Sequence, residues 1–149
     1  MKITFHPMKI GRDWANVKKV LPVRLCEDTR GILALDEQSG SIVAAVILDN
    51  WTHTAVQMHQ WVGHPMVLRH GWLEEIYQFV FQDAGRDIII GLVPGNNEKA
   101  LKFNEHLGFK EVYRIKEGFG PDEDYVIMEG RREDFARWAP EQMREAANG

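Results

Sequence analysis

Residues 87–112 hold the clearest pattern of hydrophobic and polar positions in the chain. The apolar run at residues 88–93, rich in isoleucine, is typical of a central strand covered on both faces. A turn follows at residues 94–97, and the apolar positions of residues 98–107 then repeat with helical spacing. The side-chain oxygen of Asn96 or Asn97 is suited to cap this helix, and Gly108 to end it. The stretch therefore predicts a strand, a helix and, from Phe109, a second strand.

The rest of the chain predicts a mixed sheet with helices packed on its faces. Residues 41–49 are apolar on both faces, which indicates a central strand, and residues 67–82 show the apolar stripe of a helix. Hairpin strands followed by crossover helices indicate one mixed sheet. No linker or repeat divides the sequence, so we expect residues 1–149 to form one domain. The other predicted elements are strands at 2–7, 31–36, 52–62, 109–116 and 124–129, a helix at 9–21, a loop at 117–122, and short helices within 133–147, interrupted at Pro140.

Composition and charge narrow the classes of function. The formal net charge of -4 argues against a general nucleic-acid-binding protein, which usually shows a basic face. Cys26 is the only cysteine, which excludes an intrachain disulfide and a zinc site built on several cysteines. No apolar run is as long as a membrane span, and the N-terminus does not resemble a signal peptide. We therefore expect a cytosolic protein without membrane contact.

Residues 87–112 also contain a family motif. Asn97 and Ala100 stand at the start of the predicted helix, and Leu107, Gly108 and Phe109 lead into the next strand. With this order of elements, the motif resembles the GNAT superfamily of N-acetyltransferases. The resemblance implies an α/β (α+β), acyl-CoA N-acyltransferase-like fold, with a central mixed sheet flanked by helices on both faces. It also implies transfer of an acetyl group from acetyl-CoA, as cosubstrate, to an amine.

In the family, two neighbouring parallel strands splay apart and the pantetheine arm of acetyl-CoA lies between them. Here those strands are residues 52–62 and 87–93. The cofactor pyrophosphate binds at the N-terminus of the following helix, where unpaired N–H groups suit phosphate. The family loop reads Gln/Arg-x-x-Gly-x-Gly/Ala, but this chain keeps only one permissive glycine in it. The resemblance assigns cofactor contacts to Val67, Leu68, Arg69, His70, Gly71, Trp72, Asn97 and Phe103.

Two positions depart from the family pattern. Trp72 stands where the phosphate loop is expected to have a glycine. Asn104 stands where many members have a tyrosine that protonates the leaving thiolate. Asparagine is no general acid, so a catalytic chain must use water or another group, or let the thiolate leave unassisted.

The acceptor amine must lose a proton before it attacks the thioester, and a base with a pKa near neutrality helps that step. On the first of the splayed strands, alternation places four residues near one face: His53, Gln57, His59 and Trp61. His59 approaches the splay and is the first candidate for the general base, with His53 and Glu75 as further candidates. The alternative is that these histidines are surface or hydrogen-bonded sheet residues.

His64 and His70 flank the predicted helix start, but no third ligand stands at metal-site spacing, so we expect no metal. Several acidic side chains fall in predicted loops that can flank an acceptor, and an acidic rim would favour a cationic amine. These residues are Glu27, Asp28, Glu123 and Asp124.

Two functions remain open from the sequence. The first is an N-acetyltransferase in which a primary amine of a small molecule or a protein attacks acetyl-CoA directly, with no nucleic acid as partner. Nothing in the sequence marks Cys26 as a nucleophile for a covalent intermediate. The second is a non-catalytic protein of the same fold that binds a partner or an acyl-CoA without turnover, which Trp72 and Asn104 favour. A homodimer is one of the oligomeric states left open.

Overall fold

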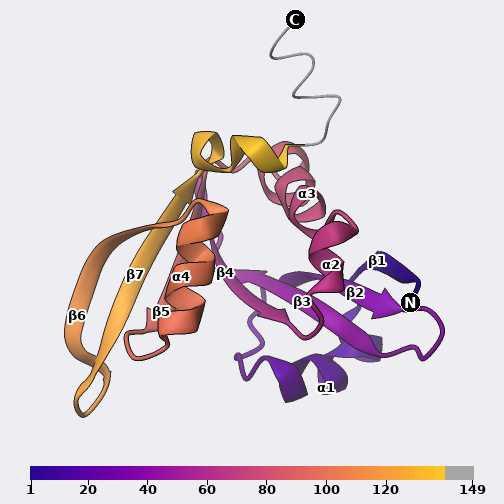
Figure 1. The fold of residues 1–149 in the computed structure, drawn as a ribbon, viewed down its shortest axis with the longest axis horizontal. Coiled ribbons are helices and arrows are strands. Elements are labelled where there is room, and N and C mark those ends of the chain that lie inside the picture. The colour runs from indigo at the N-terminus through magenta and orange to yellow at the C-terminus, as the bar shows by residue number, and fades with distance from the viewer. Residues whose placement is uncertain (140–149) are drawn as a thin grey trace, which may run out of the picture.

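The computed structural model describes residues 1–139 of the chain. Seven strands form one sheet in the order β1-β2-β3-β4-β5-β7-β6 (Figure 1). Neighbouring strands are antiparallel except β4 and β5, which are parallel, so the predicted mixed sheet is confirmed. The strands are β1 (Ile3–Pro7), β2 (Arg30–Asp36), β3 (Ile42–Asp49), β4 (Ala55–Val62), β5 (Ile88–Pro94), β6 (Lys110–Gly120) and β7 (Glu123–Arg131).

Helices lie on both faces of the sheet, as predicted (Figure 1). The first helix shares a small buried cluster with β2 and β3, in which Val17, Leu33 and Ile47 are almost fully enclosed. The later helices pack into a larger cluster on the opposite face, which we call the main core. Within residues 1–139, none of the helices has the length and apolarity needed to cross a membrane. The helices are α1 (Ile10–Val20), α2 (Met66–Arg69), α3 (Trp72–Tyr77), the π-helix η1 (Gln78–Asp83), α4 (Glu98–Leu107) and the 3-10 helix η2 (Arg132–Trp138).

The helix predicted at residues 98–107 is confirmed, including both of its ends. Asn97 is the N-cap, and its side-chain oxygen accepts the backbone N–H of Ala100 at 3.1 Å. Gly108 follows the helix with a φ of 125°, a conformation that costs glycine little. A Cβ at this position would lie 2.5 Å from the carbonyl oxygen of Asp134, so the close approach of η2 also requires glycine.

The single helix predicted at residues 67–82 is wrong in detail. Gly71 adopts a φ of 89° and separates α2 from α3. The chain then widens into η1, where the N–H of Ala84 donates to the carbonyl of Phe79 five residues earlier at 2.9 Å. The hydrophobic spacing did not indicate the break because residues on both sides of it reach the main core.

Three further boundaries differ from the prediction. β4 begins at Ala55, because the preceding residues form a bend that leaves His53 outside the strand. β6 and β7 extend through the loop predicted at residues 117–122 and meet near Asp122, whose φ is 59°. In the tail, η2 occupies residues 132–138, and the predicted interruption at Pro140 lies outside the described residues.

One part of the sheet has an apolar surface without helical cover in residues 1–139. Pairing with β7 sets Tyr113 and Ile115 of β6 opposite Ile127 and Tyr125, on the face away from the main core. Tyr113 is 66% exposed and Ile115 is 41% exposed. The buried partners of α1 lie on β2 and β3, far along the sheet order from β6. We call this surface the β6 face.

Candidate active site

β4 and β5 separate after a short parallel segment. Three residue pairs join them, and the last pair is Gln57 with Ile90. β4 nevertheless continues to Val62, paired with β3, and β5 continues to Pro94, paired with β7. Within the described chain, residues 58–62 and 91–94 therefore face each other without mutual backbone pairing. Backbone N–H and C=O groups need partners, so this opening suits a ligand that can supply them.

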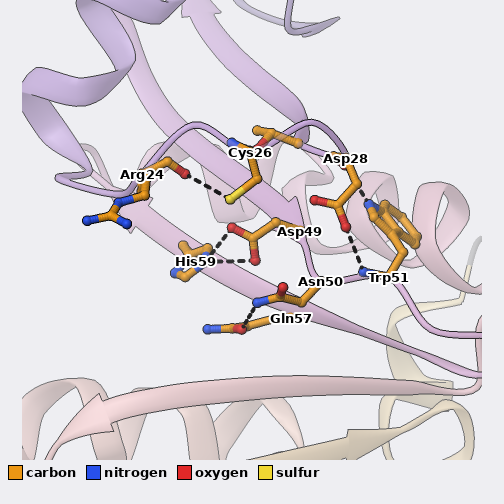
Figure 2. A network of polar contacts seen from close by, with 9 residues as sticks. Arg24, Cys26, Asp28, Asp49, Asn50, Trp51, Gln57 and His59 are labelled. Atoms are coloured by element: carbon orange, nitrogen blue, oxygen red, sulfur yellow. Dashed lines mark hydrogen bonds and ion pairs between the residues drawn. The ribbon is translucent and has the colours of Figure 1, made fainter.

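His59 lies at the start of this opening, two residues beyond the last β4 position that pairs with β5. Its Nε2 is 3.1 Å from Oδ2 and 3.2 Å from Oδ1 of Asp49, the last residue of β3 (Figure 2). Asp49 pairs with Gln57, so Asp49 and His59 are diagonal neighbours on one face. The side chain of Asp49 is 6% exposed, and that of His59 is 23% exposed. The candidate base therefore has a buried carboxylate as its partner.

Asp49 is the residue of this site that sequence reasoning missed. It follows the apolar run of β3, where an aspartate is easily interpreted as the polar residue that ends a strand. A buried carboxylate needs a hydrogen-bonded or charged partner, and His59 is that partner. The signal available in the sequence was an acidic residue at the end of one hairpin strand and a histidine on the next. To predict that these two side chains are in contact, one must know the strand register, which the sequence pattern does not give.

The loop between α1 and β2 lies beside the His59–Asp49 pair (Figure 2). Asp28 fixes it, because its Oδ2 accepts the Trp51 backbone N–H at 3.1 Å and its carbonyl oxygen accepts Trp51 Nε1–H at 3.0 Å. Cys26 is exposed in the same loop, and its thiol donates to the Arg24 carbonyl oxygen at 3.6 Å. One of the loops expected to flank an acceptor thus lies next to the candidate base.

The predicted phosphate loop is partly available to a ligand. Gly71 has a left-handed φ, as its permissive position requires. Arg69 and His70 are exposed, and within residues 1–139 no carboxylate pairs with Arg69. Val67 and Trp72 are 0% exposed, so their side chains are enclosed in the protein, and their assignment as cofactor contacts stays a prediction. Both side chains are needed by the main core.

The main core explains why a tryptophan replaces the expected glycine. The indole Nε1–H of Trp72 donates to Gln60 Oε1 on β4 at 3.1 Å, and its ring centroid lies 5.6 Å from that of Phe5 on β1. Trp72 thereby anchors the start of α3 to the sheet. Leu68 is also packed against the main core. The loop can therefore meet a phosphate with backbone N–H groups and with the side chains of Arg69 and His70.

The other two base candidates do not meet His59. Glu75 lies on the exposed side of α3, a helix that covers the face opposite His59. Partial burial, and to a smaller extent the carboxylate of Asp83, raises the pKa of Glu75. His53 is exposed in the bend before β4. Of the three candidates, His59 is the one at the opening.

Three residues of α4 and its cap bear on the donor site. Asn97 is exposed and its side chain caps the helix. Phe103 packs against the main core. Asn104 is partly buried, and its side-chain N–H group contacts the sulfur of Met128 at 3.8 Å. Asn97 is therefore accessible to a ligand, whereas the Phe103 side chain is partly buried by its packing against the main core.

A small apolar cavity of about 10 Å³ lies on the main-core side of the opening. Met58 and Gln60 of β4, Ile89 of β5, Leu73 of α3 and Leu107 of α4 are among the residues that line it. Its volume is roughly the space of one water molecule. Side chains therefore nearly fill the space between these lining residues.

The two histidines near α2 bind the backbone of that helix. His64 Nδ1 accepts the Met66 N–H at 3.1 Å, and His70 Nδ1 lies 2.9 Å from the Met66 carbonyl oxygen. In the described part of the chain, no three His, Cys, Asp or Glu side chains are grouped so as to hold a metal ion. These two histidines thus act as local hydrogen-bonding groups.

The acidic residues expected to flank an acceptor fall into two places. Glu27 and Asp28 are exposed in the loop beside His59. Glu123 and Asp124 begin β7, and Asp124 is held within the hairpin because its Oδ1 accepts the Glu117 backbone N–H at 3.1 Å. The α1–β2 loop is therefore the acidic loop next to the candidate base.

The chain was also compared with known proteins. No family model and no curated protein sequence matches it. The crystal structure of mutant forms of the spermidine/spermine N-acetyltransferase SpeG from Vibrio cholerae matches with a TM-score of 0.75 at 14% identity, covering 93% of this chain and 100% of that chain. The same enzyme in complex with manganese ions gives a TM-score of 0.75 at 14% identity, with coverage of 93% and 98%.

A dodecameric structure of spermidine N-acetyltransferase from Vibrio cholerae matches with a TM-score of 0.72 at 15% identity, covering 89% of this chain and 95% of that chain. These matches extend over nearly the full length of both chains. The chain therefore shares the fold of these solved N-acetyltransferases, and the predicted mixed sheet flanked by helices is confirmed.

Proposed function

We propose that this protein is an acetyl-CoA-dependent N-acetyltransferase that acetylates a primary amine. The early separation of β4 and β5, with His59 at its start and Asp49 behind it, is the observation on which this proposal rests. The shared fold with spermidine N-acetyltransferases supports it.

The chain's own groups fit the acetyl donor at three points. Residues 58–62 of β4 offer an unpaired backbone edge, which suits the amides of a pantetheine arm. Gly71 lets α3 begin with a free first turn, whose N–H groups suit a pyrophosphate. Arg69 adds a positive charge that is exposed to solvent. Acetyl-CoA bound there supplies an activated thioester.

His59 acts as the general base in this mechanism. A primary amine is mostly protonated at neutral pH, and only its neutral form attacks a carbonyl. The ammonium first gives one proton to water. The nitrogen–carbon bond of the neutral amine then forms while the carbon–sulfur bond breaks, and a second proton passes from the nitrogen to the imidazole of His59. The thiolate leaves unassisted or takes a proton from water, which its modest basicity, with a pKa of about 8.5, permits.

The acceptor approaches beside the α1–β2 loop. Glu27 and Asp28, against one cation at Arg24, give this loop a net negative charge, which attracts a cationic amine. The acceptors that fit are small primary amines and amine groups of proteins. The solved enzymes of the same fold act on spermidine, itself a cationic amine.

A second function is favoured by two residues. Trp72 fills the core where a phosphate loop has glycine, and Asn104 offers no acid to a leaving thiolate. A protein that binds an acyl-CoA or a partner without turnover would tolerate both changes.

We also propose that the protein self-associates through the β6 face. Tyr113 and Ile115 expose apolar area on an edge strand, and edge strands pair readily with other chains. A second copy is the occupant that this surface fits, because Lys116 and Glu117 of β6, which form no ion pair within residues 1–139, can meet in opposite-charge pairs across a two-fold axis. A spermidine N-acetyltransferase of the same fold is dodecameric.

Thermal stability in the presence of acetyl-CoA separates the two functions from each other and from an inert fold. A ligand that binds only the folded chain raises Tm. An N-acetyltransferase should show a rise in Tm with acetyl-CoA and also release free thiol when a panel of primary amines is added. A rise in Tm without thiol release would support the non-catalytic binder. No change in Tm at millimolar acetyl-CoA would contradict the N-acetyltransferase and the acyl-CoA binder, and would leave only the protein that binds a partner.

A further inference from the structure

The carboxylate of Asp49 is buried and bound to one imidazole. Its side chain is 6% exposed, and both of its oxygens lie within 3.2 Å of His59 Nε2. Among the described residues, no other group donates a hydrogen bond to this carboxylate. A buried carboxylate is costly unless it is paired or hydrogen-bonded, so the fold keeps Asp49 where it can hold His59.

The chemistry of a carboxylate determines which nitrogen of His59 bears the proton. An ionised carboxylate has only acceptor oxygens, so Nε2 must be the donor in this contact. In neutral His59, Nδ1 then holds the lone pair, and no hydrogen-bond partner occupies Nδ1 within residues 1–139. We propose that Asp49 is a positioning residue that fixes His59 in the Nε2–H tautomer and leaves Nδ1 as the base.

The proton balance of the proposed reaction follows from this arrangement. One proton leaves the amine nitrogen for His59 Nδ1 as the amide bond forms, while the Nε2 proton stays in its hydrogen bond to Asp49. The imidazolium formed is stabilised by the adjacent carboxylate, which itself remains ionised. Nδ1 later gives its proton to water. This catalytic consequence rests on the proposed function, but the tautomer does not.

The hydrogen bond between Asn50 and Gln57, next to the His59–Asp49 contact on the same face, provides a matched control for the Asp49 variant. Asn50 Nδ2–H donates to Gln57 Oε1 at 2.7 Å, next to the His59–Asp49 contact but without an atom in it (Figure 2). Asn50 has a φ of 51°, which glycine adopts freely. The Asn50→Gly variant therefore removes a neighbouring hydrogen bond and leaves the backbone unstrained.

Nitrogen NMR of histidine-labelled protein tests the tautomer directly. The signals of His59 are assigned by their loss in His59→Gln, and they should show protonated Nε2 and unprotonated Nδ1 in the neutral ring. Asp49→Asn keeps the shape of the side chain but offers Nε2 an amide donor as well as a carbonyl acceptor, so the fraction of neutral His59 rings protonated on Nε2 should fall. Asn50→Gly should keep the original tautomer. A wild-type His59 protonated on Nδ1 would overturn the inference whether or not the protein transfers acetyl groups.

Kinetics test the catalytic consequence separately. In Asp49→Asn, kcat should fall by about 10²- to 10⁴-fold, while KM for acetyl-CoA changes by less than about threefold. Asn50→Gly should keep kcat within about twofold. An Asp49→Asn variant with shifted tautomer and unchanged kcat would remove Asp49 from the positioning role. If the wild type has the expected tautomer but transfers no acetyl group to any amine, the tautomer stands and the proposed function fails.

Discussion

His59 is the residue on which the proposed chemistry depends most. It is the candidate base at the opening between β4 and β5, and it lies on the face opposite the main core. In His59→Ala, kcat should fall by about 10²- to 10⁴-fold, because a general base typically contributes that much. Thiol release at saturating acetyl-CoA measures the change. His106→Ala, which removes an exposed histidine from the last turn of α4, is the control and should keep the wild-type rate.

Cys26 tests whether transfer is direct. Its thiol donates to the Arg24 carbonyl oxygen and, among the described residues, forms no hydrogen bond with His59. Cys26→Ala should therefore keep kcat within about twofold, since direct attack by the amine needs no enzyme nucleophile. Mass spectrometry of the wild type with acetyl-CoA alone should detect no acetylated chain. An acetyl group on Cys26, together with an inactive Cys26→Ala variant, would replace direct attack by a covalent route.

Glu75 predicts a small dependence of stability on pH. Burial first, and Asp83 second, raise the pKa of Glu75 in the folded chain. The folded state therefore holds this proton more tightly than the unfolded state, so stability from protonation is present at low pH and is lost as pH rises through the raised pKa. Glu75→Gln should raise Tm slightly at neutral pH and give no gain below pH of about 4. Thermal melts at both pH values check this, and an equal gain at both would contradict the assignment to ionisation.

At the scale of elements, α4 shows how far sequence patterns reach. Its bounds and its Gly108 stop were predicted, and its cap was narrowed to Asn96 or Asn97, because each depends on residues within a few positions. The break at Gly71 and the π-helix η1 were missed, because tertiary packing of α3 against the sheet decides them. Asp49 was missed for the same reason, since its contact depends on strand register.

The cap of α4 gives a prediction for that element. Asn97→Ala removes the hydrogen bond from the Ala100 N–H, so the free energy of unfolding should fall by about 1 kcal/mol. Asn97→Ser should keep most of the stability, because serine also caps. Denaturant unfolding measures both. If Asn97 also contacts the donor, its two variants should differ from the wild type in acetyl-CoA affinity as well, whereas a pure cap would change stability alone.

At the scale of the whole molecule, the β6 face exposes apolar side chains that no helix of residues 1–139 covers. Ile115→Lys places a charge on this face and should shift a self-associated protein to the monomer, because burying a lysine there is costly. Light scattering coupled to size-exclusion chromatography measures the mass. Ile10→Lys is the control, since Ile10 is 44% exposed, against 41% for Ile115, but lies on α1. Equal masses for wild type and Ile115→Lys would remove the β6 face as an interface.

The short contact between β4 and β5 also has a consequence for how the chain assembles. β1 to β4 pair with their sequence neighbours, and so do β6 and β7, so these two groups of strands can form from local contacts. Only three residue pairs in the sheet tie β4 to β5, across a long helical crossover. Such distant contacts form late in folding, and we expect their amide hydrogens to exchange with solvent earlier than those of β3. β5 pairs with β7 and so belongs with the second group of strands. A donor bound in the opening would slow that exchange, because it would contact both β4 and β5, which share only three residue pairs.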